Sequence, residues 1–449
     1  MKTSCTGAIR GLWDELNQGL FPWIDDNIGE LDARHRLFRT VCEAVIRPRE
    51  FDYAKWKGNG RPPASRLKIF KAFLLKAVLN VKDTKELVRM LRAEPLSRRL
   101  CGWDSPGLVP SETRFCRVFG EFAERGFTDE WFAEMIVKHH GDIPAETVSY
   151  DSAPIEVRSR AANAKRRLAR IDPDQPPPPS PISVQGARTA EANMAELPVE
   201  CEWGCKRDSQ GKGMQWKGGK IHAAVTRDGV PIAVKYTSAS LHDSQVMVPL
   251  ARQASERVPH LFDLADAAYD AEPIRAACAE LGTVAVIDAN PRRSAEAHAM
   301  SELEREVYRD RSAAERFFSH LLESHGGRTV RVRAPAKVAL HPLLGTVVVA
   351  VERMLRMVCR RRVPGNGRGH RRRRRWKAES PAAALPENPA SPRTSRKKVR
   401  PHQFLETRTL VGLGERLAAI LFKNLGKRYQ HLAPPSIRQR FTWSAISRP

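Results

Sequence analysis

KIHAAVTRDGVPIAVKYTSAS, residues 220–240, is the stretch that decides the class of fold. Apolar and polar side chains alternate along both of its halves, which is the pattern of a strand with one buried face. Between the halves, Arg227-Asp228-Gly229 supplies the Asp-Gly pair typical of a tight turn between antiparallel strands. The stretch therefore predicts a β-hairpin with strands at 220–226 and 231–240.

The segments on either side of this hairpin continue a regular rhythm. The pattern predicts, in chain order, a strand at 147–155, the hairpin, a helix capped by Ser244, a strand at 261–269, a helix in AEPIRAACAELG, a strand at 284–290 and a helix at about 311–323. This order of elements is typical of an RNase H-like α/β fold with a mixed sheet.

The first 140 residues have a different, all-helical pattern. RLKIFKAFLLKAVLN (66–80) spaces its apolar residues like one face of a helix and its basic residues like the other. Asp83 and Glu86 have the spacing of a capping box at the start of the next helix, and a further helix is expected after Pro110. Short basic helices with tight turns fit a DNA-binding domain, although a helical protein-contact domain has the same pattern.

Composition divides the chain into three parts. We expect a helical DNA-binding domain at 1–140, a catalytic α/β domain at 141–358 and a basic low-complexity tail at 359–449, with a possible helix at 404–431. Within the second part, residues 156–200 lose the periodic pattern and include the run Pro176 to Pro179. That segment is expected to be a largely disordered insertion after a possible short helix.

The net charge of +25 and the pI of about 10.1 indicate a polyanionic partner, for which nucleic acid is the first candidate. A basic surface that only aids solubility, or a membrane-surface protein, is the alternative. Between residues 360 and 400, 15 Lys or Arg stand against 2 Asp or Glu, and Arg371 to Arg375 are consecutive. This tail is expected to be disordered and to add sequence-independent DNA affinity, unless it is a solvated segment without a role.

Targeting signals and cysteine usage favour a cytoplasmic protein associated with the nucleoid. No apolar run is expected to reach the roughly 20 residues of a membrane helix, and residues 1–16 lack the features of a signal peptide. The eight cysteines are scattered, and no second pair has zinc-ligand spacing to match Cys201 and Cys205. Reduced thiols are therefore expected.

Three carboxylates carry the predicted chemistry. Asp151 and Asp266 come at the ends of two apolar strands, where an unpaired charge is costly, and neighbouring strands would bring the two together. Glu315 lies on the last predicted helix, on the side of Phe318 and Leu322, and is expected to face the sheet. Taken singly, an Asp at a strand end is usually a turn residue and a Glu on a helix is usually solvated, so the prediction depends on their combination.

Clustered carboxylates repel one another, and divalent cations relieve that repulsion. Hard oxygen ligands suit Mg²⁺ or Mn²⁺. Two such ions about 4 Å apart activate a water or a 3′-hydroxyl for in-line attack on a phosphodiester. The sequence thus predicts a site with two ions at Asp151, Asp266 and Glu315.

Several motifs resemble one known family. Tyr308, Arg311 and Glu315 fit the signature Tyr-x2-Arg-x3-Glu of DDE transposases from bacterial insertion sequences, in the group named after insertion sequences four and five. Further matching segments are SYDSAP around Asp151, SASLHDSQVMVPL at 238–250, DLADAAYDAEPIRA around Asp266, GGRTVRVRAPAKV at 326–338 and, upstream, GRPPASRLKIFKAFLLK with the segments that follow it. The upstream likeness is to the helical domain that often precedes this catalytic core.

This resemblance implies the activity, the partners and the site residues. It implies a transposase that binds terminal inverted repeats, acts as a homodimer across paired ends, cleaves DNA and joins it to target DNA. Asp151, Asp266 and Glu315 would be the catalytic metal ligands, and Tyr308, Arg311, Lys220 and Arg316 would contact DNA. Without the resemblance, packing of Tyr308 and a salt bridge from Arg311 to a nearby acid is the simpler interpretation.

The sequence departs from the family pattern at three places. Leu322 stands where the family has a Lys seven residues after the Glu, and Gly219 stands where it has an aromatic residue before Lys220. Ala267-Ala268 stands where the family has a small residue followed by Gly. The basic tail is also foreign to the family. Two alternatives therefore stay open: a catalytically decayed copy that only binds DNA, and an RNase H-like nuclease that uses water alone.

Overall fold

The computed structural model describes residues 31–54, 62–162, 181–207, 213–290, 300–328 and 330–361. Its first part is all-helical, as expected, with α3 (Ala33–Val45), η2 (Pro48–Ala54), α4 (Arg66–Val78), α5 (Thr84–Ala93), α6 (Pro95–Leu100), η3 (Pro106–Leu108), α7 (Glu112–Arg125) and α8 (Phe127–His140). Asp83 caps α5 as predicted, because its side chain accepts a hydrogen bond from the Glu86 amide at 2.9 Å.

An aromatic cluster forms the centre of this helical part. Phe51, Phe70, Phe122 and Trp131 are buried, and their ring centroids lie 5.3–6.0 Å apart, mostly edge to face. Each ring comes from a different element, so the cluster fixes η2, α4, α7 and α8 against one another.

The second part is a six-stranded mixed sheet. Its strands are β1 (Ala145–Glu156), β2 (Glu202–Arg207), β3 (Gly213–Thr226), β4 (Pro231–Ser238), β5 (His260–Ala265) and β6 (Val284–Ile287). The order is β2-β3-β1-β5-β6, and β4 also pairs with β3; β1, β5 and β6 are parallel, and the other pairs are antiparallel. The predicted hairpin is β3–β4, and the arrangement is that of an RNase H-like core.

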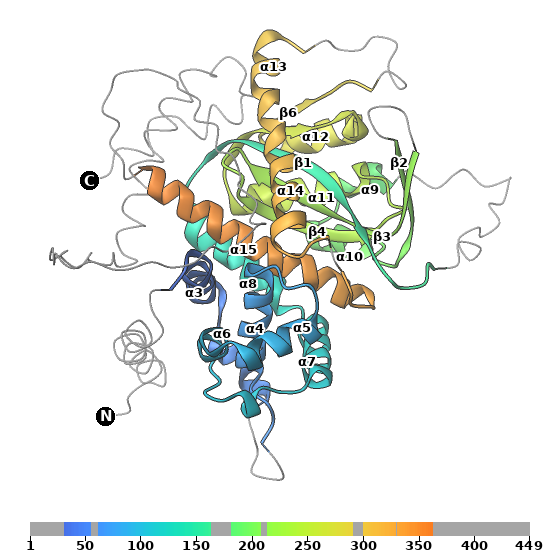
Figure 1. Ribbon diagram of the computed structural model, residues 1–449. Helices are drawn as coiled ribbons and strands as arrows, with labels where there is room; N and C mark the ends of the chain where they lie inside the picture. Colours follow the sequence, from blue (N-terminus) through green and yellow to red (C-terminus); the bar gives the residue numbers. More distant parts are fainter. Residues whose placement is uncertain are drawn as a thin grey trace, which may run out of the picture.

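Helices cover both faces of this sheet (Figure 1). One face packs on α11 (Ser244–Arg257) and α12 (Glu272–Leu281), and the other on α14 (Ser312–Ser324). Alternate residues of β1 divide accordingly: Val148 and Tyr150 belong to the core that includes α11, whereas Ala153 and Ile155 belong to the core under α14. Asp151 therefore lies on the α14 face. The remaining short elements are η5 (Ala267–Tyr269), α13 (Glu302–Tyr308) and η6 (Arg309–Arg311).

The long helix α15 (Pro335–Arg361) joins the two parts of the molecule. It contacts α3, α4, α7 and α8 of the helical part and also β4 and α14 (Figure 1). The helix continues past residue 358, where the sequence suggested a domain boundary. Within the described chain, its Pro335–Met357 stretch is the one helix long and apolar enough to cross a membrane, contrary to the expectation that no such run exists. Its most apolar window is 67% buried inside the fold, so those side chains are used for packing.

Other differences from the expected elements are local. The supposed insertion is partly folded, because α9 (Pro181–Gln185) and α10 (Ala190–Glu196) pack against α11 and strand β2 follows them. Asp243, rather than Ser244, holds the cap position of α11, and Ser244 is its first residue. The described cysteines are free, as expected. Residues 163–180, the arginine-rich tail and the possible helix at 404–431 lie outside the described residues.

Candidate active site

Asp151 and Asp266 lie side by side in the sheet register. On the adjacent parallel strands β1 and β5, Ser149 pairs with Leu264, and each aspartate follows two residues later. Strand β5 ends at Ala265, so Asp266 is the first residue beyond the strand. Asp151 was expected at a strand end, but it lies inside a strand, because β1 continues to Glu156 in pairing with β3. The expected neighbouring of the two strands is confirmed.

Local hydrogen bonds orient both aspartates. The Ser152 amide donates to Asp151 Oδ1 at 2.7 Å, and the Ala268 amide donates to Asp266 Oδ1 at 2.9 Å in the first turn of η5. Burial raises the pKa of Asp151 to about 6, and the negative charge of Asp266 adds to the rise, against lowering contributions from the Ser152 amide, Lys206 and Arg311. Burial is the main cause, so the charged form of Asp151 is costly there, and a bound cation would favour it.

Glu315 stands in the first turn of α14, on the exposed edge of that helix. The buried residues of α14 are Ala313, Ala314, Phe317, Phe318 and Leu321, whereas the Glu315 side chain is 54% exposed. Its Oε1 accepts a 2.6 Å hydrogen bond from Arg311 Nη2. The neighbours of Glu315 on α14 therefore face the sheet as expected, but its own carboxylate is turned to the exposed edge of the helix.

Arg311 connects the three carboxylates. Besides its bond to Glu315, its guanidinium interacts electrostatically with Asp151 and Asp266, and these acids contribute to raising its pKa although burial acts in the opposite direction. The three acids do not form a closed ligand set in this conformation: in the described part of the chain, the three ligand atoms that all approach within 4.8 Å belong to His320, His325 and Glu352. Arg311 therefore pairs directly with Glu315 and is close enough to Asp151 and Asp266 to interact with their charges.

Tyr308 supports Arg311 from the side. The guanidinium carbon lies 5.8 Å from the centroid of the Tyr308 ring, a cation–π arrangement. The ring is half-buried against the cluster of Phe262, Leu264 and Val286, and burial raises the pKa of Tyr308 to about 12. The structure agrees with the simpler interpretation from sequence: Tyr308 packs against its neighbours, and Arg311 pairs with an acid, Glu315. Arg316, four residues after Ser312, is exposed and donates to the Ser312 hydroxyl.

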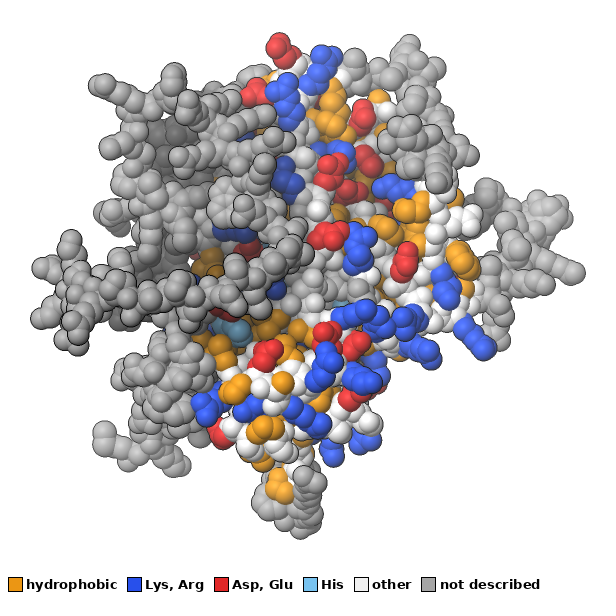
Figure 2. Space-filling view, in the orientation of Figure 1, with side chains coloured by type: hydrophobic (Ala, Val, Ile, Leu, Met, Phe, Trp, Pro, Cys, Tyr) orange, Lys and Arg blue, Asp and Glu red, His pale blue; other side chains and the backbone are white. Residues whose placement is uncertain are grey.

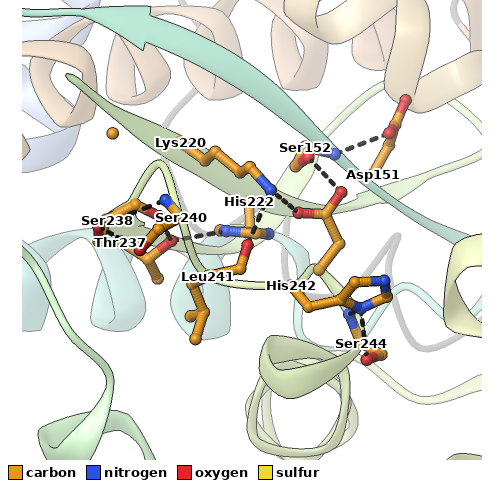
Figure 3. A network of polar contacts seen from close by, with 12 residues as sticks. Asp151, Ser152, Lys220, His222, Thr237, Ser238, Ser240, Leu241, His242 and Ser244 are labelled. Atoms are coloured by element: carbon orange, nitrogen blue, oxygen red, sulfur yellow. Dashed lines mark hydrogen bonds and ion pairs between the residues drawn. The ribbon is translucent and has the colours of Figure 1, made fainter. Parts of the chain in front are cut away.

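Lys220 is held in an ion pair on the α11 face of the sheet, since Ile221 and Ala223 on either side of His222 belong to the core under α14. Its side chain is 13% exposed, and Nζ donates to Asp243 Oδ1 and to the Leu241 carbonyl, both at 2.8 Å (Figure 3). Asp243 also accepts from Ser152 Oγ at 2.9 Å, which ties it to the residue after Asp151. Burial alone would raise the pKa of Asp243, but His222, Lys220 and Ser152 lower it. A DNA contact by Lys220 would require this ion pair to open.

A buried polar network braces the strands beneath the aspartates. Asp263 on β5 is completely buried; its Oδ1 accepts from Tyr150 Oη at 2.7 Å and pairs with His260 Nε2 at 2.8 Å, and its Oδ2 accepts from the Thr283 hydroxyl. Burial would raise the pKa of Asp263, but His260, Thr283 and Tyr150 lower it. Sequence reasoning missed Asp263 and Asp243, because most of their partners come from other elements. Tyr150 directly precedes Asp151, so the network fixes the position of that carboxylate.

Comparison with known protein families agrees with this geometry. Residues 180–349 match a family model described as a transposase DDE domain, and residues 25–121 match one described as a transposase domain (DUF772). The two matches support a DDE transposase. The first covers Asp266, Glu315 and α14 and begins after Asp151, and the second covers α3 to α6 and most of α7. No curated protein matches the sequence.

The DDE domain implies nuclease and transposition activity in general, and this family generally uses divalent metal ions. The donor set of this chain fits such ions, because its two adjacent aspartates and nearby glutamate are hard oxygen ligands.

Proposed function

We propose that this chain catalyses metal-dependent cleavage at transposon ends and transfer of the 3′-hydroxyl into target DNA, as a member of the group named after insertion sequences four and five. One observation carries the proposal: the β1–β5 register sets Asp151 beside Asp266, on the sheet face that α14 crosses with Glu315. Two Mg²⁺ or Mn²⁺ ions would supply charge at the attacking and leaving oxygens.

Arg311 would act as the switch between the resting and DNA-bound arrangements. Its guanidinium binds phosphate with the same two-pronged geometry as carboxylate, so an entering phosphodiester competes with Glu315 for it. Movement of Arg311 onto the phosphate leaves Glu315 free to turn toward the aspartates. Tyr308 would keep the guanidinium near the reacting phosphate, and Arg316 would contact the adjacent backbone.

The helical part would bind the terminal inverted repeats. Helix α5 buries Leu87, Val88 and Leu91, and it exposes Lys85, Arg89 and Arg92 on the opposite side. Figure 2 shows Lys and Arg side chains gathered over the part of the molecule where Figure 1 places α5 and α7. Basic side chains on one helix face suit a phosphate backbone. Two copies of the chain would hold the paired ends as a homodimer.

A cleavage assay on a plasmid that carries the DNA flanking the gene tests this function. With Mg²⁺, we expect cuts at the inverted repeats and joined products in target DNA. Asp266→Asn should abolish both reactions and keep end binding. Asp288→Asn is the matched control: it removes an exposed carboxylate just beyond the next parallel strand, β6, and should leave both reactions intact. Cleavage by the Asp266→Asn protein would show that the triad assignment is wrong.

A second candidate, a protein that binds the ends without cutting them, is favoured by one observation. At Leu322, where the resemblance calls for a Lys, the side chain packs on the core between α14 and the sheet. It therefore supplies no phosphate contact. End binding with no Mg²⁺-dependent product would support this candidate, whereas cleavage without joined DNA would support an RNase H-like nuclease.

A further inference from the structure

Three metal-ligating side chains meet at a point outside the candidate active site. His320 Nε2 lies 2.7 Å from Glu352 Oε2 and 3.3 Å from His325 Nε2, and the latter lies 3.6 Å from the same carboxylate oxygen. Within the described chain, this is the group whose three ligand atoms all fall within 4.8 Å of one another. The cluster is half-buried, with His325 the most enclosed.

Two helices contribute to the cluster. His320 belongs to α14, His325 is the residue at the end of that helix, and Glu352 belongs to α15. The two imidazole rings stand edge to face at a centroid distance of 4.7 Å, so both Nε2 atoms point to the same space. Gly345 permits the close approach of α15, because a Cβ there would lie 2.7 Å from the His325 carbonyl oxygen.

The outer partners of the cluster prepare it for a cation. His325 Nδ1 lies 3.1 Å from the Ala77 carbonyl of α4, which can only accept, so Nδ1 carries the proton and Nε2 presents its lone pair. A backbone carbonyl on the far nitrogen is the usual way in which a metal-binding histidine is oriented. Arg356 holds the other oxygen of Glu352, which leaves Oε2 directed at the two rings.

The distances agree with a tetrahedral zinc-type site. Metal–ligand bonds of about 2.0–2.1 Å place the ligand atoms of a tetrahedron about 3.3–3.4 Å apart. Two of the three distances, 3.3 Å and 3.6 Å, are close to this value, and the 2.7 Å contact needs to open by roughly 0.6 Å. Two imidazoles with one carboxylate prefer Zn²⁺ over Mg²⁺, because nitrogen ligands suit the softer ion.

We propose that His320, His325 and Glu352 bind one Zn²⁺ ion, with water at the fourth position. The ion links α14, which carries Glu315, to α15 and, through Ala77, to the end of α4. It is a structural clamp between the helical part and the catalytic helix. The proposal is independent of the reaction assigned to the aspartates, since none of its ligands belongs to that site.

Metal binding by the full-length chain tests this proposal. The protein is stripped with EDTA, dialysed and titrated with Zn²⁺ alone, and then with Co²⁺, whose visible absorption is intense in a tetrahedral site and weak in an octahedral one. We expect about one tightly bound ion per chain and the intense Co²⁺ spectrum. His320→Gln and Glu352→Gln should each weaken the Zn²⁺ affinity by 100-fold or more.

Glu323→Gln is the matched control, because Glu323 is an exposed carboxylate on the same helix that pairs with Arg328 outside the cluster. It should bind Zn²⁺ like the unmodified protein. All variants keep every cysteine, so any Zn²⁺ bound by thiols is the same in each protein and does not affect the difference in affinity between them. Equal Zn²⁺ affinity in all proteins would overturn the proposal, and so would a weak octahedral Co²⁺ spectrum of the unmodified chain, a result that does not depend on any variant folding.

Discussion

Arg311 Nη2 lies 2.6 Å from Glu315 Oε1, one helical turn away, while the same guanidinium faces the charges of Asp151 and Asp266. A cation of the protein itself thus pairs with one acid of the site and acts electrostatically on the other two. Arg311 partly neutralises the carboxylates at rest, and in our proposal it is also the group that recognises the scissile phosphate.

Arg311→Ala should reduce both end binding and cleavage. Loss of the two-pronged phosphate contact is expected to weaken binding of an end fragment and to slow single-turnover cleavage by about 100-fold, because phosphate positioning is lost. Arg311→Lys keeps the charge without the fork and should recover binding more than cleavage. Faster cleavage by Arg311→Ala would instead mean that Arg311 only blocks Glu315.

Asp151→Asn should stabilise the metal-free fold near neutral pH. The folded-state pKa of Asp151, about 6, lies above its ordinary value of 3.8. Its proton therefore stabilises the fold fully below pH 3.8, and this contribution is lost as the pH rises through about 6. The neutral amide avoids the loss, so we expect a gain of roughly 1–3 kcal/mol at pH 7.5 and less at pH 5.

Urea unfolding in EDTA at the two pH values measures this difference. Added Mg²⁺ should stabilise the unmodified protein and leave Asp151→Asn unchanged, since the variant lacks one proposed ligand. The same gain at pH 5 and pH 7.5 would show that Asp151 titrates normally in the fold.

Asp263→Asn should destabilise the fold far more than Tyr150→Phe does. The first change leaves His260 without its charged partner in a fully buried site, which costs about 3–5 kcal/mol. The second removes one hydrogen bond of 2.7 Å and should cost about 1 kcal/mol. Denaturant unfolding of both variants at pH 7 gives the comparison, and similar losses would contradict the central place of Asp263 in the network.

The triple change Lys85→Ala, Arg89→Ala and Arg92→Ala should weaken DNA binding and make it less dependent on salt. Each lost phosphate contact reduces the slope of log K against log salt by about 0.9, so a decrease of about 2–3 is expected. Binding of an end fragment at several salt concentrations measures the slope. Lys138→Ala, which removes an exposed charge from α8, is the control, and an unchanged slope in the triple variant would exclude α5 as a DNA contact.

The order of the main strands and helices could be predicted because alternation and turn residues are local properties. The hairpin, the capped α5 and the strands that carry the two aspartates followed from them. Strand β2 was missed because EWGCKR has no alternation and exposes Trp203. Helix α15 was missed because its run Val347–Val351 has the β-branched composition of a strand and Pro342 interrupts the helical pattern.

Which residues share the site was only partly predictable. Parallel neighbouring strands imply that Asp151 and Asp266 meet, and that inference needed no tertiary information. The partners of Asp243 and Asp263, and the meeting of His320 with Glu352, depend on side chains brought together from different elements. The orientation of Glu315 toward Arg311 depends on rotamers, which sequence spacing does not determine.

The position of α15 has a consequence for biosynthesis. The helices α3 to α8 are translated first, yet α15, which packs against them, leaves the ribosome about 220 residues later. At about 5–20 residues per second, the apolar surface of the nascent helical part waits roughly 10–45 s for its cover. During that interval the emerging chain exposes a natural substrate for chaperones, and a transcript truncated before α15 would yield a protein that aggregates.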